Sequence, residues 1–177
     1  MLRALALLSS LALAGCLSTD PAAPLQAAPL TADEAARVDD VLERLYRSFS
    51  HGDGEEPDWE LMRSLFVEGA QCVTETPTGQ APRPQPVDAF ISAWRTSVRD
   101  RASPTLETGE RILDARTTRV GRLIRVDVLF QAQKRDDPAP RTPGLDSLVL
   151  VDVGGDWKIL SFVVHYESKL QEASVST

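Results

Sequence analysis

The sequence is poor in the side chains that most often bind metals or act as covalent nucleophiles. Among 177 residues there are two cysteines, Cys16 and Cys72, and two histidines, His51 and His165. The histidines lie far apart in the sequence, and no Gly-x-Ser-x-Gly nucleophile motif is present. We therefore predict a protein without a metal site and without a bound cofactor.

Basic side chains are also in deficit. The chain has 19 Lys and Arg against 26 Asp and Glu, a formal net charge of −7, and it lacks a basic patch with interleaved aromatic residues. This pattern argues against nucleic acid as a partner. The acidic residues are dispersed, which is typical of a solvated surface. With 42% hydrophobic residues, the chain is long and apolar enough to fold around a core of its own.

No hydrophobic run is long enough to cross a bilayer, but a short one stands at the N-terminus. Arg3 precedes an apolar stretch at residues 4–12, which is the arrangement of a secretory signal. The stretch leads into LAGC at residues 13–16, which resembles the lipobox of bacterial lipoproteins. The resemblance implies that a diacylglyceryl group is transferred to the Cys16 thiol, that the chain is cleaved before Cys16, and that the acyl chains bind membrane lipid.

The residue after the modified cysteine is Leu17. By resemblance to the sorting rule of bacteria with two membranes, a residue other than Asp at this position favours the outer membrane, with the domain facing the periplasm. Acylation of Cys16 leaves one other cysteine, Cys72, so an intramolecular disulfide cannot form. We predict that Cys72 is a buried, inert thiol in a short strand.

The chain divides into four segments. Residues 1–15 are predicted to be the signal peptide, and residues 16–30 the lipidated cysteine with a flexible tether rich in alanine and proline. Residues 31–167 are predicted to form the folded domain. Residues 168–177 are polar and are predicted to be a disordered tail.

Helical patterns occupy the first half of the domain. Thr31 and Glu34 have the spacing of a capping box, and apolar residues from Val38 to Phe49 follow at helical spacing. Asp58 is placed to cap a short second helix, and a third amphipathic stripe runs from Val87 to Val98.

The period changes from 3.6 to 2 after the third helix. Strands are predicted near residues 106–118 and 122–133, and a final hairpin spans Leu145 to His165 around two glycines. The order is helix, helix, short strand, helix and four antiparallel strands. Helices gathered on one face of an antiparallel sheet indicate the α+β class.

Three segments carry a family resemblance: LYRSFSHGD at residues 45–53, DWELMRSLF at 58–66 and GDWKILS at 155–161. On these segments the domain resembles the nuclear transport factor 2-like superfamily, which includes ketosteroid isomerases and polyketide cyclases. The resemblance implies a cone-shaped, curved antiparallel sheet packed against three N-terminal helices, with an apolar pocket inside the cone. It does not imply one function.

The residues that face such a pocket depend on the register of the final hairpin. If Val153–Gly155 form a three-residue loop, Trp157 and His165 face inward and Asp146 faces outward. If Gly154–Gly155 alone form the turn, one strand flips relative to its partner. We prefer the first register because it gathers β-branched residues and the tryptophan on one side, and it predicts that no carboxylate points inward.

The preferred register defines a predicted ligand pocket. Its lining residues are Tyr46, Trp94, Phe130, Trp157, Ser161 and His165. Without an inward carboxylate, we expect a domain that binds a small hydrophobic ligand or a protein partner without catalysis. One alternative is an isomerase, dehydratase or cyclase that uses His165 as base and Tyr46 as hydrogen-bond donor. The other is a structural module that forms a homodimer through the open face of its sheet.

Overall fold

A computed structural model describes residues 28–51, 55–74, 82–100, 107–134 and 143–166. Within these ranges the chain forms, in order, α1 (Ala32–Phe49), α2 (Trp59–Ser64), β1 (Phe66–Thr74), β2 (Gln85–Pro86), α3 (Val87–Asp100), β3 (Glu107–Val120), β4 (Leu123–Lys134), β5 (Gly144–Val153) and β6 (Asp156–Tyr166). The predicted signal peptide, most of the tether and the C-terminal tail lie outside the described residues. Across the described ranges, no helix is long and apolar enough to cross a membrane.

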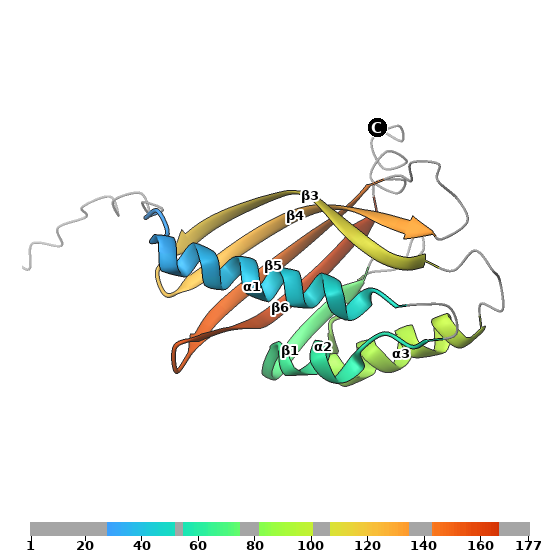
Figure 1. Ribbon diagram of the computed structural model, residues 1–177. Coiled ribbons are helices and arrows are strands. Elements are labelled where there is room, and N and C mark those ends of the chain that lie inside the picture. Colours follow the sequence, from blue (N-terminus) through green and yellow to red (C-terminus); the bar gives the residue numbers. More distant parts are fainter. Residues whose placement is uncertain (1–27, 52–54, 75–81, 101–106, 135–142, 167–177) are drawn as a thin grey trace, which may run out of the picture.

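The strands form one curved sheet with the order β2-β1-β6-β5-β4-β3, and the helices lie against its concave side (Figure 1). Strands β3 to β6 pair antiparallel with their neighbours, while β1 joins the sheet parallel to β6. The predicted fold class, a curved sheet packed against helices from the N-terminal half, is therefore confirmed. We call the side covered by the helices the inner face and the opposite side the outer face.

Helix α1 begins at the predicted capping box, and its first turns are bound to two neighbouring strand ends. The Thr31 side chain accepts a hydrogen bond from the Glu34 N–H at 3.3 Å, and Glu34 accepts one from the Thr31 N–H at 2.9 Å. Glu34 also pairs with Arg119, and the Arg37 guanidinium donates to the Gly155 carbonyl at 2.8 Å. These contacts hold the start of α1 to the turn ends of β3 and β6.

The core lies between the helices and the inner face. Helix α1 contributes a buried stripe that includes Val38, Val41, Leu42, Leu45 and Phe49. The inner face contributes every second residue of β4 and β5, as expected for a sheet that is covered on one side, together with residues of β6. These buried strand residues include Ile124, Val126, Val128, Phe130, Leu148, Leu150, Ile159 and Phe162.

The final hairpin turns through two residues, so the preferred register was wrong at this point. Val153 pairs with Asp156, and Gly154 and Gly155 form the turn with φ of 67° and 98°. Positive φ at both central residues suits the right-handed twist of the flanking strands, and glycine adopts it without steric cost. The two adjacent glycines therefore favour the two-residue turn over a three-residue loop.

A bulge in β6 explains why the sequence prediction also assigned the residues after Ile159 to the wrong face. Val149 pairs with Ser161 and Leu150 pairs with Ile159, so Leu160 is an extra residue without an opposite partner. The bulge changes the phase of the strand, and both Ile159 and Phe162 are buried on the inner face. Strict alternation along β6, on which the sequence prediction depended, cannot represent this change.

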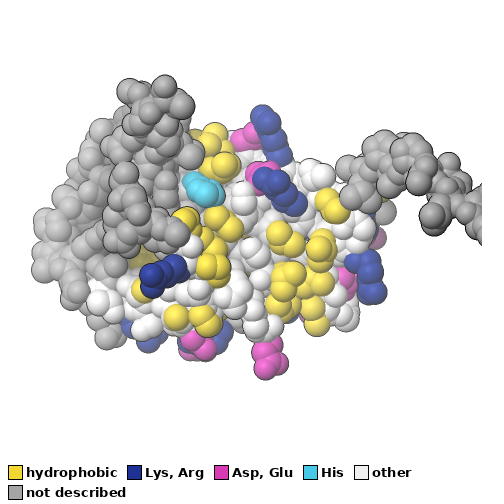
Figure 2. Space-filling model, turned by 180° about the vertical axis from the view of Figure 1, so that it is seen from behind, with side chains coloured by type: hydrophobic (Ala, Val, Ile, Leu, Met, Phe, Trp, Pro, Cys, Tyr) yellow, Lys and Arg dark blue, Asp and Glu magenta, His cyan; other side chains and the backbone are white. Residues whose placement is uncertain are grey.

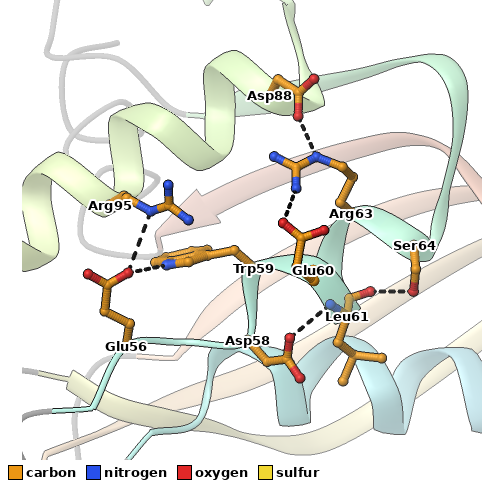
Figure 3. Close-up of polar contacts among 9 residues, drawn as sticks. All are labelled: Glu56, Asp58, Trp59, Glu60, Leu61, Arg63, Ser64, Asp88 and Arg95. Carbon is orange, nitrogen blue, oxygen red and sulfur yellow. Dashed lines mark hydrogen bonds and ion pairs between the residues drawn. The ribbon is translucent and has the colours of Figure 1, made fainter.

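Figure 3 shows how the short helix α2 is fixed against α3. The Asp58 side chain accepts a hydrogen bond from the Leu61 N–H at 2.9 Å, which confirms it as the predicted cap. Arg63 then bridges the two helices, because it binds Glu60 at 2.7 Å and Asp88 of α3 at 2.6 Å. The pairs are exposed, so we assign them to helix orientation and not to a binding site.

An aromatic chain continues from α2 through α3 to α1. The Trp59 indole N–H donates to Glu56 at 3.1 Å, and Arg95 stands 5.6 Å from the Trp59 ring (Figure 3). The Trp59 ring lies 6.3 Å from Trp94, which in turn lies 4.5 Å from Phe49. This chain of rings fills the space between the helices at the C-terminal end of α1.

Candidate functional site

A buried hydrogen bond joins α1 to β5 across the inner face. The Tyr46 hydroxyl donates to Asp146 Oδ2 at 2.6 Å, and the two residues are 4% and 1% exposed. Among the described residues, Asp146 is the one acidic or basic side chain that is fully buried. Buried ionisable groups are rare unless they are paired, and they gather at functional sites more often than elsewhere.

The environment of this pair changes the pKa of both groups. Burial raises the pKa of Asp146 to about 7, although the hydrogen bond from Tyr46 acts in the opposite direction. Burial, and then the charge and hydrogen bond of Asp146, raise the pKa of Tyr46 above its usual range. Asp146 therefore exchanges between its charged and neutral forms near neutral pH, while Tyr46 keeps its proton.

The second oxygen of the carboxyl group is unpaired. Asp146 Oδ1 is buried and has no hydrogen-bond partner among the described residues. An ionised carboxylate presents several acceptor positions, and an unsatisfied one in a core is costly. The neutral form of Asp146 removes part of that cost, in agreement with the raised pKa.

The pair has two hydrogen-bonded states with different chemistry. When Asp146 is ionised, the Tyr46 hydroxyl donates its hydrogen bond to the carboxylate, and the Tyr46 oxygen can then only accept from a third group. When Asp146 is neutral, it can donate to the Tyr46 oxygen, and the Tyr46 O–H becomes available as a donor. One protonation event on Asp146 thus exchanges the hydrogen-bonding role of Tyr46.

The register of β5 positions Asp146, and the periodicity of α1 positions Tyr46. Asp146 lies opposite Val128 of β4 and Val164 of β6, both of which face the core. Tyr46 follows Leu42 by one helical turn and therefore shares its buried face. Apolar neighbours on both adjacent strands explain why the carboxyl group depends on a partner from the helix.

Phe130 packs against the pair and depends on a glycine. Its ring lies 6.2 Å from the Tyr46 ring, and it covers Gly144, which is opposite Phe130 in the sheet. A Cβ atom at Gly144 would stand 2.2 Å from the Phe130 ring. The absence of a side chain at Gly144 therefore allows Phe130 to lie flat on β5, two residues from Asp146.

A groove of about 780 Å³ runs between α1 and β3, and Tyr46 lines it. The volume is in the range that small-molecule sites occupy. The other lining residues are Asp39, Leu42, Glu43, Arg47 and Ser50 of α1, with Glu110, Arg111, Ile112 and Ala115 of β3. Asp146 is not one of the lining residues, and it bonds to Tyr46 from β5.

The groove has apolar walls and a charged rim. Leu42, Ile112 and Ala115 supply apolar surface, while Asp39, Glu43 and Arg47 lie on successive turns of α1. Glu110 of β3 is close enough to Tyr46 to contribute to its raised pKa. The groove therefore offers an apolar contact surface that includes Tyr46, the residue hydrogen-bonded to Asp146.

The residues predicted to line the pocket do not form one site. Tyr46 and Phe130 are neighbours on the inner side. Trp94 belongs to α3 and lies in the aromatic chain between the helices, and Trp157 is buried near the turn of the final hairpin, opposite Asp152.

Ser161 and His165 lie on the outer face. They pair with Val149 and Leu145, which alternate with the inward residues of β5. His165 is therefore separated from Tyr46 by the sheet, and the predicted pairing of these two residues is wrong. The residue that Tyr46 binds is Asp146, which the preferred register placed outside.

A sequence signal for Asp146 did exist. The two adjacent glycines favour a two-residue turn, and that alternative reverses the orientation of one strand. What the sequence does not display is the bulge at Leu160, since neither glycine nor proline marks it. Without the bulge, the two-residue turn would have placed either the apolar residues of β5 or those at the end of β6 on the outer face.

The two cysteines have different status. Cys72 is fully buried in β1, which confirms the predicted burial, and burial raises the pKa of its thiol to about 12, as is typical of an unreactive cysteine. Cys16 lies outside the described residues. Within the described ranges, no three His, Cys, Asp or Glu side chains come together in a group that could hold a metal ion.

Three of the solved structures that are similar to this chain illustrate the likeness. Aln2 from a Streptomyces species has a TM-score of 0.62 and 12% identity, over 82% of this chain and 99% of that one. A nuclear transport factor 2-like protein of unknown function from Pseudomonas putida KT2440 has a TM-score of 0.60 and 12% identity, over 77% and 89%. A Catenulispora acidiphila protein in complex with S-DNPA has a TM-score of 0.60 and 14% identity, over 80% and 99%.

Sequence comparison adds no relative to this set. No protein-family model matches the sequence, and no curated protein matches it significantly. At identities of 12% to 14%, the structural likeness shows the fold alone. The domain thus has the nuclear transport factor 2-like fold.

Proposed function

We propose that this nuclear transport factor 2-like domain binds a small organic molecule in the groove between α1 and β3, without catalysis, and that a lipid on Cys16 holds it at the cell envelope. The observation that carries the proposal is the hydrogen bond of 2.6 Å between Asp146 and Tyr46, the residue that lines the groove. A core has no packing need for an acid at this position, so a role in recognition accounts for it better.

The chemistry of the groove suggests the kind of ligand. Leu42, Ile112 and Ala115 favour an apolar body, and the charged rim favours polar substituents that remain in water. A group that accepts a hydrogen bond, such as a carbonyl, gains a donor from Tyr46 when Asp146 is neutral. The Catenulispora acidiphila structure, which holds S-DNPA, is a precedent for a small molecule on this fold.

The binding site is tested by filling the groove from an exposed position. Ala115 is exposed and lines the groove, so Ala115→Trp should block it without disturbing the core. Thr118→Trp is the matched control, because Thr118 is exposed on the same strand but lies opposite Arg125 on the outer face.

The measurement is ligand-observed NMR with a library of small carbonyl compounds. We expect compounds that bind the wild type and Thr118→Trp but lose binding to Ala115→Trp. Compounds that bind all three proteins equally would place the site elsewhere. A library without any hit would contradict the proposed ligand class.

The lipid anchor rests on the LAGC pattern at residues 13–16 and is tested separately. Cys16→Ser should give an unprocessed precursor that takes up no labelled fatty acid. Normal processing of the variant would rule out the anchor. Because Leu17 is not Asp, we expect the wild-type protein in the outer-membrane fraction, facing the periplasm.

A second candidate function, an acid–base enzyme acting on a carbonyl compound, is favoured by the pKa of Asp146, which lies near 7. In this mechanism Tyr46, backed by neutral Asp146, stabilises the oxygen of an enolate. Glu110, which lines the same groove, takes the proton from the adjacent carbon. Proton exchange of ketone probes in D₂O tests it: exchange faster than in buffer, and lost in Tyr46→Phe and Glu110→Gln, would establish catalysis, whereas a buffer rate leaves the binding function alone.

A further inference from the structure

We propose that the domain docks on the phospholipid surface through an apolar patch at the turn ends of its two hairpins. We call it the tip patch and define it as Val120, Leu123, Val151 and Val153. The proposal rests on the lipid anchor proposed above, because the anchor supplies both the surface and the proximity.

The tip patch is contiguous on the outer face. Val120 lies opposite Leu123 across β3 and β4, and Leu123 lies opposite Val151 across β4 and β5. Directly opposite residues of antiparallel strands share a face and lie about 5 Å apart. Val153 follows Val151 by two residues and therefore projects from the same face. Figure 2 shows that hydrophobic side chains gather over this side of the sheet.

The patch is unusually exposed for its composition. Val153 is 51% exposed and Val120 is 47% exposed, which are the two highest values among the large hydrophobic residues of the described chain. Both valines adjoin turn glycines, at Gly121 and Gly154, where polar residues are usual. Two β-branched apolar side chains at adjacent hairpin ends are thus left about half exposed to solvent.

The tip patch is at the end of the domain where the tether joins. The first turns of α1 are fixed to these hairpins by the Glu34–Arg119 pair and by the hydrogen bond of 2.8 Å from Arg37 to Gly155. Figure 1 shows the N-terminal end of α1 beside the turns of β3–β4 and β5–β6. Leu30, which precedes the helix cap, packs against the core, so the path of the chain is fixed up to this point.

Because the tether keeps the domain close to the membrane, even a weak affinity of the tip patch for lipid is enough for docking. Residues 17–30 span at most roughly 50 Å when fully extended, at about 3.5 Å per residue. A short linker holds its domain at an effective concentration on the order of 1 mM at the surface to which it is attached. A patch of four side chains with millimolar affinity for lipid would be too weak for a free protein, but is occupied for much of the time on the anchored one.

The charges beside the patch fit a mainly zwitterionic surface. Arg122 lies in the turn next to Val120, and Asp156 lies opposite Val153, both exposed. One basic and one acidic side chain suit phosphate and ammonium groups together, and a strongly anionic surface would repel a chain of net charge −7. We therefore select vesicles of phosphatidylethanolamine with a minor fraction of phosphatidylglycerol.

Hydrogen exchange of the lipidated full chain, in such vesicles and in detergent, tests the proposal. For a patch docked more than about half of the time, we expect amides at residues 119–123 and 151–155 to exchange about two- to fivefold more slowly on vesicles. The double variant Val120→Asp, Val153→Asp should stay on the vesicles through its lipid and lose this protection. Leu113→Asp is the matched control, because Leu113 is 41% exposed but lies at the middle of β3, seven residues from Val120, and it should keep the protection.

The outcomes separate docking from the anchor. If the wild type stays on the vesicles but its turn amides exchange as in detergent, docking is wrong and the anchor stands. If the protein carries no lipid and does not bind vesicles, the proposed anchor is wrong, and the docking proposal, which depends on it, is wrong as well. Protection that appears without vesicles and grows with protein concentration would assign the tip patch to a second copy of the chain, and would overturn the proposal. A Val120→Ser, Val153→Ser variant replaces the aspartate variant if inner-face amides show that the latter is unfolded.

Discussion

Asp127 and Asp146 lie on neighbouring strands, one register step apart, and face opposite sides of the sheet. On the outer face, one oxygen of Asp127 accepts hydrogen bonds from Ser147 at 2.7 Å and from Arg125 at 3.0 Å. On the inner face, Asp146 accepts a single bond from Tyr46, and its other oxygen is unpaired among the described residues. An aspartate is thus a half-exposed cross-strand partner on the outer face and a buried acid on the inner face.

The difference shows that strand register decides the chemistry of this domain. A shift of one residue exchanges the two faces of a strand. It would expose Asp146 and bury Ser147 in its place. The candidate site therefore depends on the turn at Gly154–Gly155 and the bulge at Leu160 as much as on Tyr46 and Asp146.

The largest effect on stability that tests this contrast comes from truncating the side chains of two adjacent residues of β5. Leu148 is fully buried, so Leu148→Ala should lower the free energy of unfolding by about 2–5 kcal/mol. Val149 is half-buried on the outer face, so Val149→Ala should cost less than about 1.5 kcal/mol. Urea denaturation measures both, and the reverse order would mean that β5 has the opposite register.

The next effect is the pH dependence that Asp146 gives to stability. Its pKa is about 7 in the folded protein and 3.8 as the ordinary value, so the folded state binds more protons between these limits. Stability therefore falls as pH rises from about 4 to about 7, by up to about 4 kcal/mol from this group, and changes no further beyond that range.

Asp146→Asn removes this contribution. The difference in unfolding free energy between the variant and the wild type should grow in favour of the variant as pH rises from 4 to 7. Asp127→Asn is the matched outer-face control and should keep the wild-type fall. Parallel pH profiles for Asp146→Asn and the wild type would show that Asp146 is ionised throughout.

The smallest of the three effects belongs to the hydrogen bond itself. Tyr46→Phe leaves ionised Asp146 without its donor, which should cost about 1–3 kcal/mol at pH 8. The cost should be smaller at pH 5, where Asp146 is neutral. In the Asp146→Asn background the two pH values should give the same cost, and a difference that persists there would assign the pH dependence to another group.

Local signals in the sequence predict much of the fold. The capping pattern of Thr31 and Glu34 and the cap at Asp58 depend on residues three positions apart, and both are present as predicted. The stripe of α1 and the period-2 pattern of β4 likewise require neither a distant contact nor an irregularity. These features give the element order and the α+β class.

The candidate site is predicted in part. Tyr46 is identified from the sequence, but its partner depends on how β5 and β6 align, and that alignment includes a bulge that the residues at 149–150 and 160 do not signal. The groove depends on the approach of α1 to β3, where a Cβ atom at Gly109 would stand 2.7 Å from the Ser50 hydroxyl. Contacts between residues so far apart in sequence follow from tertiary packing and leave no periodic pattern.

The most direct test of the inner-face site is the titration of the Asp146 side chain by ¹³C NMR, with its carboxyl signal assigned by comparison with Asp146→Asn. We predict a midpoint near pH 7 for the wild type, as burial beside Tyr46 requires. A midpoint near the ordinary value of 3.8 would mean that the carboxyl group is solvated, and would contradict both the inner-face position of Asp146 and the site built on it.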